Sequence, residues 1–235
     1  MLKIPKDLYL DGNKFMTDAY DRLAAKLSVM KNNGGNSLFT MTGCEPGVGT
    51  TATAISTAVS LAMAKHSVLL VDADMRKPSS QKRLNQNVRY GLSDFLTDDI
   101  DFQDATGHTN FEYLDYMSCG NKLDNPVMLI NSAVFDEFLD YLKSSYDYVV
   151  FDTPSLNATV DAGVIASKTS GVVLVAGYLQ TRTSQINAAK KELVQLNANI
   201  LGIILNNIPK SKYKRFVGFY DYFEANQSKK PKQQR

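Results

Sequence analysis

A glycine-rich segment, MTGCEPGVGTTATA at residues 41–54, is the first part of this 235-residue chain whose residue types and spacing could do chemistry. A glycine-rich turn at the start of a helix can direct successive backbone N–H groups at a phosphate, and the helix dipole strengthens the attraction. Gly47 and Gly49 would let the backbone approach a ligand closely, and Thr51 is placed to offer its hydroxyl to Mg²⁺. The segment therefore predicts a phosphate-binding loop.

The segment fits the phosphate-loop formula G-x-x-x-x-G-K-[ST] only in part. Thr51 matches the Ser/Thr position, but Cys44 stands at the first glycine and Thr50 at the lysine. Taken alone, the segment is equally compatible with a strand-to-helix turn that binds no ligand. The interpretation therefore depends on its neighbours.

Three aspartates follow apolar runs elsewhere in the chain. Asp72 and Asp74 end the segment VLLVDAD, and Asp152 ends the segment YVVFD. In an open parallel sheet, ligands bind beyond the carboxyl ends of the strands, where these side chains would meet. Buried carboxylates repel one another unless a cation neutralises them. Each aspartate alone could be a cap or turn residue, but together with the loop they predict a site for Mg²⁺ and a nucleotide.

The elements that must position these residues alternate between strand and helix. Each apolar run is of strand length and lacks the polar alternation of a half-exposed strand, which predicts an α/β fold with a doubly wound, mostly parallel sheet covered by helices on both faces. The predicted strands are 37–42, 67–72, 147–152, 171–176 and 200–206, with 112–117 as a further candidate. The predicted helices are 14–31, 51–65, 133–143 and 184–196, and Val134, Phe138, Leu139 and Leu142 are expected to share the buried face of the third.

Length and composition favour one domain. The chain is 44% hydrophobic and 21% charged, which is globular and argues against disordered, collagen-like and coiled-coil classes. No apolar run approaches the ~18 residues of a membrane span, and the N-terminus has no apolar stretch typical of a secretory signal. Two cysteines are too few for a disulfide framework and suit a cytoplasmic protein. We expect a domain at 1–209 and a tail at 210–235.

The tail carries a charge that the balanced total hides. It contains eight Lys or Arg residues against Asp221 and Glu224, whereas the whole chain has 26 basic and 24 acidic residues. A basic tail favours an anionic partner such as a membrane surface or nucleic acid. A solvated tail that keeps the protein soluble explains the same charge.

At this point the segments GCEPGVGTT, VLLVDADMRKP and YDYVVFDTPS resemble the Walker A, Walker A′ and Walker B segments of bacterial tyrosine kinases. The resemblance is to the CpsD/CapB type of capsule and exopolysaccharide operons, which is similar to the MinD/ParA branch of P-loop ATPases. It extends from about Asp18 to Tyr222. It includes residues 91–96, the triplet Asp124-Asn125-Pro126, the triplet Val160-Asp161-Ala162 and residues 199–206.

The resemblance implies ATP and Mg²⁺ as cofactors and a role for each matching residue. Asp72, Asp74 and Asp152 would be catalytic, with Asp72 orienting or deprotonating the acceptor hydroxyl, and Thr51, Asp74 and Asp152 would organise the metal. The residues implied for the nucleotide are Pro46, Gly47, Val48, Gly49, Thr50, Thr51, Ala52 and Asn206, the last near the base. The implied phosphate acceptors are Tyr213, Tyr220 and Tyr222, which could instead pack the tail onto the domain.

The chain departs from the family pattern in the residues that matter for catalysis and assembly. Thr50 replaces the Walker A lysine, and Val48 replaces the usual glutamate two residues earlier. Asp21 and Ala24 replace the two arginines of ExYRxLR, the motif through which family members form rings.

The missing lysine has a large expected cost. A cation about 4 Å from a phosphate oxygen is worth roughly 4 kcal/mol at an effective dielectric near 20, or about 10³ in rate if it acts only in the transition state. Arg76 and Lys77 flank the site and are the candidates to compensate.

Three functions remain open on the sequence alone. The first is an active protein-tyrosine autokinase that regulates polysaccharide polymerisation and export, activated by the cytoplasmic segment of a membrane co-polymerase and held by it at the inner membrane face. The second is a pseudokinase that serves the same machinery as a scaffold or switch. The third is a ParA/MinD-like ATPase on DNA or membrane, although Glu45 or Cys44 stands where that group has an early lysine. A cognate tyrosine phosphatase and a homo-oligomer with a weakened ring motif are also implied, and no specific nucleic acid is expected.

Overall fold

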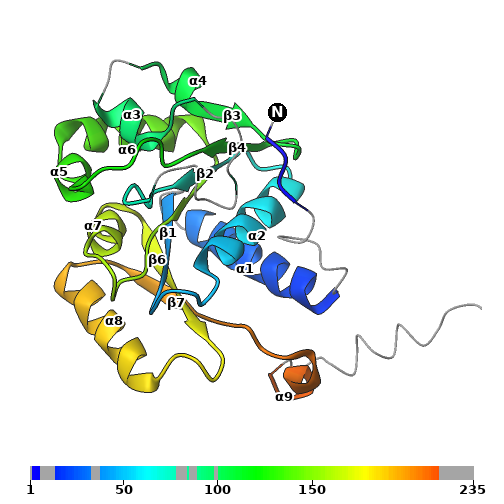
Figure 1. Ribbon diagram of the computed structural model, residues 1–235. Helices are drawn as coiled ribbons and strands as arrows, with labels where there is room; N and C mark the ends of the chain where they lie inside the picture. The colour runs from blue at the N-terminus through cyan, green and yellow to red at the C-terminus, as the bar shows by residue number, and fades with distance from the viewer. Residues whose placement is uncertain are drawn as a thin grey trace, which may run out of the picture.

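The structure is a computed structural model that describes residues 2–5, 14–32, 38–77, 84, 89–97 and 100–216. Within these residues, seven strands form one sheet in the order β3-β4-β2-β5-β1-β6-β7 (Figure 1). Neighbouring strands are parallel except β3 and β4, which form an antiparallel pair at one edge. The strands are β1 (Leu38–Gly43), β2 (Val68–Asp72), β3 (Thr106–His108), β4 (Leu114–Met117), β5 (Tyr148–Asp152), β6 (Gly171–Gly177) and β7 (Ile200–Asn206).

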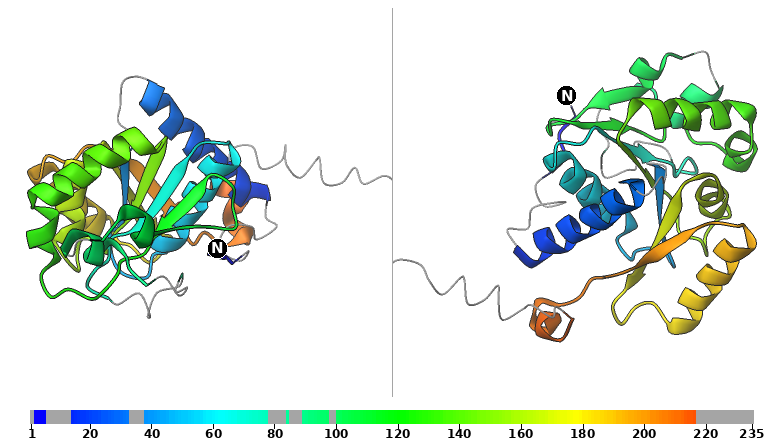
Figure 2. Two further views of the ribbon diagram at one scale, coloured as in Figure 1. Left: turned by 90° about the horizontal axis from the view of Figure 1, so that it is seen from above. Right: turned by 180° about the vertical axis from the view of Figure 1, so that it is seen from behind.

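Helices cover both faces of the sheet. Helices α1 and α2 pack on one face, and α6, α7 and α8 pack on the other (Figure 2). The helices of the described residues are α1 (Lys14–Asn32), α2 (Thr50–Met63), α3 (Leu92–Thr97), α4 (Phe102–Ala105), α5 (Pro126–Ile130), α6 (Ala133–Ser145), α7 (Asp161–Lys168), α8 (Thr183–Gln195) and α9 (Tyr213–Phe216), with a 3₁₀ turn at Lys210–Lys212. None of them has the length and hydrophobicity that a bilayer crossing requires.

The central strands are apolar on both sides because both sides are covered. In β5, Tyr148 and Val150 belong to the core under α1 and α2, while Val149 and Phe151 belong to the core under α6. Successive side chains of a strand point to opposite faces, so a strand buried on both faces is a continuous apolar run. This confirms the prediction of a doubly wound, mostly parallel sheet.

The predicted strands and helices are present, with ends shifted by one or two residues, and the candidate strand at 112–117 is β4. The short elements were not predicted: β3, a three-residue strand whose residues are intermediate or exposed, and the helices α3, α4, α5, α7 and α9, none longer than eight residues. Elements of this length are too short to produce a clear periodicity.

Two predictions of burial were wrong. Strand β7 is not covered on both faces, because Ile203 and Leu205 are 44% and 41% exposed. The physical reason is its place at the sheet edge, where it pairs with β6 on one side and α8 covers it only in part. In α6, Val134 is 46% exposed and Phe135 takes the buried position.

Candidate functional site

The loop between β1 and α2 has the tight backbone that the sequence predicts. Gly47 and Gly49 have φ angles of 82° and 87°, in the left-handed region that glycine adopts without steric cost. A Cβ atom on Gly49 would clash with the side-chain amide of Asn206. Gly49 is the N-cap of α2, and this fully described helix has neither a side-chain cap bond nor an acidic residue in its first turn. The start of α2 therefore presents backbone N–H groups to an anion.

Side chains from two distant segments hold the loop in this shape. Glu45 accepts hydrogen bonds from Oγ1 of Thr181 at 2.7 Å and from Nε2 of Gln185 at 3.0 Å. On the other side of the loop, Nδ2 of Asn206 donates to the carbonyl oxygen of Val48 at 2.9 Å. The loop is thus fixed to the start of α8 and to the end of β7 by contacts within the protein.

The three aspartates meet at the carboxyl edge of the sheet, as predicted. Asp72 and Asp152 are register partners in β2 and β5 and are 6% and 7% exposed. The backbone N–H of Asp74 donates to Oδ1 of Asp72 at 3.0 Å. Burial raises the pKa of Tyr116 well above its usual value, and the negative charges of Asp72 and Asp152 raise it further. The edge therefore carries negative charge in a buried setting.

A cavity of about 440 Å³ joins the loop to this edge. It is lined by the loop and the start of α2, by the segment after β2, and by the segment after β5. Among the residues predicted to bind nucleotide or metal, those that line it are Pro46, Gly47, Gly49, Thr50, Thr51, Ala52, Asp74 and Asp152. Three predicted residues do not line it. Val48 is buried behind the loop, Asn206 anchors the loop, and Asp72 holds the backbone of Asp74.

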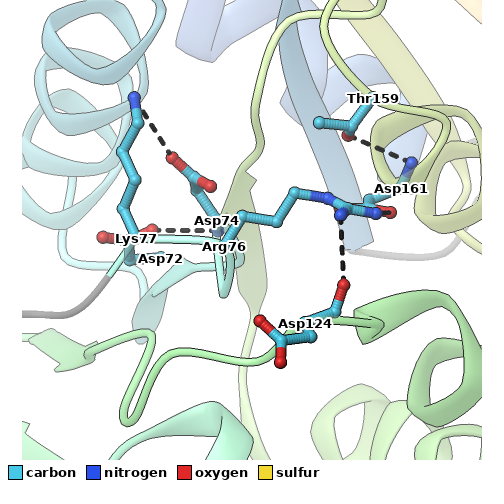
Figure 3. A network of polar contacts seen from close by, with 7 residues as sticks. All are labelled: Asp72, Asp74, Arg76, Lys77, Asp124, Thr159 and Asp161. Carbon is cyan, nitrogen blue, oxygen red and sulfur yellow. Dashed lines mark hydrogen bonds and ion pairs between the residues drawn. The ribbon is translucent and has the colours of Figure 1, made fainter.

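Two cations of the segment after β2 also line the cavity, in different states (Figure 3). Arg76 makes a two-pronged ion pair with Asp161, at 2.6 Å from Nε and 2.8 Å from Nη2, and a longer bond to the carbonyl oxygen of Asp124 at 3.4 Å. Its bond to Asp161 raises the pKa of the guanidinium. Lys77 has a side chain 66% exposed, and its ammonium lies 3.9 Å from Oδ2 of Asp74.

Thr50 occupies the position of the Walker A lysine at the first residue of α2. Its short side chain stays beside the loop, since a Cβ atom on Gly43 would lie 2.7 Å from its Oγ1. The segment from Cys44 to Ala52 contributes one carboxylate, Glu45, and no cation. Any positive charge inside the cavity must therefore come from outside the loop.

The residues present suit Mg²⁺ only in company with phosphate. Within the described part of the chain, no group of three or more His, Cys, Asp or Glu side chains could hold a metal ion. Asp74, Asp152 and the hydroxyl of Thr51 nevertheless line one cavity, and they are the oxygen donors that Mg²⁺ prefers alongside phosphate oxygens. When bound, Mg²⁺ would neutralise phosphate charge.

Of the predicted phosphate acceptors, the structure describes Tyr213. It opens α9, its side chain is partly buried, and its ring lies edge-on to Phe15 of α1 with centroids 5.8 Å apart. Tyr220 and Tyr222 lie outside the described residues.

Helix α1, which contains the segment compared above with ExYRxLR, is tied to α2. Oγ of Ser60 in α2 donates to Oδ1 of Asp21 at 2.6 Å. Arg22 makes an ion pair within the helix, at 2.6 Å from Asp18. Asp21, which stands at an arginine position of the motif, therefore serves an internal contact.

Comparison with known proteins places this site in a family. Residues 39–207 match the AAA domain family model AAA_31. The chain is 31% identical to the tyrosine-protein kinase CpsD of Streptococcus agalactiae over 190 residues. The aligned region covers 80% of this chain and 82% of that protein. The chain belongs to the CpsD/CapB family of bacterial tyrosine kinases.

The fold of this family member is similar to that of solved structures. The chimerical protein CapA2B2 superposes with a TM-score of 0.80 at 28% identity, over 89% of this chain and 94% of that one. MinD of Pyrococcus horikoshii, solved as a complex with Mg-ADP, superposes with a TM-score of 0.59 at 21% identity, over 75% of this chain and 76% of that one. The second likeness shows a shared P-loop fold alone.

The contacts that fix this family member's loop were not predicted from the sequence. Glu45, Thr181 and Gln185 form a cluster whose members are separated by 136 and 140 positions from Glu45, so no local pattern joins them. Thr181 also lies before the predicted helix at 184–196, so no helical periodicity pairs it with Gln185.

Proposed function

We propose that the chain binds ATP with Mg²⁺ at the β1–α2 loop and acts as a protein-tyrosine autokinase that regulates capsular or exopolysaccharide biosynthesis and export. The observation that carries the proposal is the single cavity shared by the glycine loop, the start of α2 and the carboxylates Asp74 and Asp152. Membership of the CpsD/CapB family supports the same function.

In this proposal the loop residues and the carboxylates have separate tasks. The backbone N–H groups from Gly47 to Thr51 bind the phosphates, and Asn206 lies on the side of the base. Asp74, Asp152 and the Thr51 hydroxyl organise the metal. Asp72 orients the acceptor hydroxyl, directly or through the backbone of Asp74 that it holds.

The acceptors in this proposal are Tyr213, Tyr220 and Tyr222 of the C-terminal tail. The partner is the cytoplasmic segment of a membrane polysaccharide co-polymerase, which keeps the kinase at the inner face of the membrane. A cognate tyrosine phosphatase would reverse the modification.

A second candidate, a pseudokinase in the same machinery, is favoured by two observations. Because Thr50 stands at the lysine position, the loop has no cation. Asp21 stands at an arginine position of the ring motif and accepts a hydrogen bond from Ser60. A ParA/MinD-like ATPase is less well supported, because Glu45 occupies the region of that group's early lysine and is bonded to Thr181 and Gln185.

Intact-mass spectrometry after incubation with Mg²⁺ and ATP tests the proposal, with and without the cytoplasmic segment of the co-polymerase. The double variant Asp72→Asn/Asp74→Asn provides the blank. Phosphate added to the wild type alone, and mapped to the tail tyrosines, is the expected result. No added mass in any sample would reject the autokinase and leave the pseudokinase.

A further inference from the structure

The cavity needs a cation that its loop does not supply. A nucleotide polyphosphate carries several negative charges, and the loop residues around it include Glu45 and no basic side chain. Asp74 and Asp152 line the same space. Mg²⁺ and backbone N–H groups would offset part of this negative charge, and in a partly buried site a side-chain cation on the phosphates would offset more of it. Among the described residues that line the cavity, the cations are Arg76 and Lys77.

Arg76 is committed to another task. Both prongs of its guanidinium hold Asp161, which is 1% exposed, and a third N–H reaches the carbonyl of Asp124. Moving Arg76 to a phosphate would leave the buried carboxylate of Asp161 without its cation, which is strongly unfavourable. Arg76 is therefore a fixed part of the cavity wall.

Lys77 combines a fixed backbone with an accessible side chain. Its N–H donates to the carbonyl of Asp74 at 3.4 Å, and its own carbonyl accepts from Sγ of Cys119 at 3.2 Å. The ammonium, in contrast, lies 3.9 Å from Asp74 on a side chain that is 66% exposed. An exposed ion pair at this separation is weak, so the ammonium can exchange Asp74 for a stronger anion at little cost. Figure 3 shows Lys77 beside Asp74 and apart from the Arg76–Asp161 pair.

We propose that Lys77, on the segment after β2, supplies the phosphate-binding cation that Thr50 cannot, and that Asp74 holds its ammonium when no nucleotide is bound. The ligand group is the polyphosphate of a nucleotide, so the inference rests on the proposed nucleotide binding. The position differs from that of a Walker A lysine, because the cation reaches the phosphates from the segment after β2, which β5 separates from β1, and not from the loop itself.

The first test is the dissociation constant for ATP, measured by isothermal titration calorimetry with Mg²⁺ and again in EDTA. Lys77→Met is expected to weaken ATP binding at least about tenfold in both buffers, because a charge-assisted bond to phosphate is lost. Lys77→Arg is expected to stay within about threefold of the wild type, since the charge is kept. The matched control is Lys122→Met, because Lys122 is 58% exposed, lies 3.9 Å from Asp124 and does not line the cavity.

A second measurement needs no variant. Lysines of the wild type are acetylated with a limiting reagent, with and without saturating ATP, and read by peptide mass spectrometry. ATP is expected to protect Lys77 and to leave the labelling of Lys122 unchanged, while adenosine, which has no phosphate, protects neither.

The outcomes separate this inference from the proposed function. ATP binding that is equal in the wild type and Lys77→Met, with Lys77 unprotected, overturns the role of Lys77 and leaves nucleotide binding intact. No ATP binding by the wild type, together with binding by Thr50→Lys, overturns both, because Lys77 then fails to replace the loop lysine. Weaker binding by Lys77→Met with an unchanged Lys122→Met and a preserved Lys77→Arg supports the inference.

Discussion

At the scale of single residues, the loop is specified by glycines with positive φ and by the side chains that oppose them. Gly49 has a φ of 87° and faces the amide of Asn206 at a distance that leaves no room for a Cβ atom. A glycine with ordinary surroundings, Gly202 in β7, has no atom within 4 Å of its would-be Cβ. The two positions therefore separate the effect of the loop from that of glycine replacement in general.

Gly49→Ala is expected to lower the free energy of unfolding by about 2–4 kcal/mol, from the left-handed backbone and the displaced Asn206. Binding of ATP should be lost with it. Gly202→Ala should change the stability by less than about 1 kcal/mol. Urea unfolding followed by circular dichroism measures both. Equal effects of the two variants would contradict the assigned loop geometry.

Thr50 offers the reverse experiment, in which a substitution is expected to strengthen ATP binding. Thr50→Lys is expected to tighten ATP binding by about 2 kcal/mol, or roughly thirtyfold, because the added ammonium meets phosphate. Thr50→Met, of similar length and without charge, serves as the control. Calorimetric titration that finds the two variants equal would mean that the loop does not bind phosphate.

At the scale of elements, side chains from the start of α8 and the end of β7 fix the shape of the loop. Glu45 joins the loop to the start of α8 through Thr181 and Gln185. Glu45→Ala leaves both donors without this acceptor, and we expect a loss of about 1–2 kcal/mol in stability together with faster hydrogen exchange of the loop amides. Glu137→Ala, at an exposed position of α6, should leave the exchange of those amides unchanged. Exchange rates measured by mass spectrometry that do not differ between the two would refute the anchoring role.

The elements themselves were largely predictable from the sequence, for a physical reason. A strand buried on both faces must be apolar throughout, so β1, β2, β5 and β6 are visible as apolar runs, of which β1 ends at the loop and β2 and β5 end at an aspartate. Strand β7 has a similar run but lies at the edge, and hydrophobicity alone does not distinguish an edge from a centre. The edge at which these strands end was predictable too, because the carboxyl ends of parallel strands meet at the same edge of a sheet.

The contacts across the site were not predictable in this way. The pairs Arg76–Asp161 and Glu45–Thr181 join positions 85 and 136 residues apart, and only the order of the strands brings them together. Sequence patterns suggested that Arg76 and Lys77 flank a phosphate site. They could not indicate that a buried carboxylate holds one and leaves the other accessible.

At the scale of the whole molecule, the strand order brings the residues of the site together. Strand β5 lies between β2 and β1, so Asp152 sits beside Asp72 on one side and beside the strand that leads into the loop on the other. The Arg76–Asp161 pair then links the segment after β2 to the start of α7 across the cavity. This pair is the main ionic link in the described wall of the site.

Arg76→Met is expected to destabilise the protein by about 3–5 kcal/mol, because it leaves the buried Asp161 without its cation. In a chain of this size that corresponds to a fall in Tm of roughly 6–20 °C. Arg76→Met/Asp161→Asn should recover a large part of the loss, since no buried charge remains. A thermal scan in which the double variant is no better than the single one would rule out this view of the pair.

The anchored loop also has a kinetic consequence. Because Glu45 and Asn206 already hold the loop in its turn, a ligand does not have to wait for the loop to rearrange. Association should therefore proceed at a rate set by encounter, and variants that alter the phosphate contacts should differ mainly in how long the complex lasts.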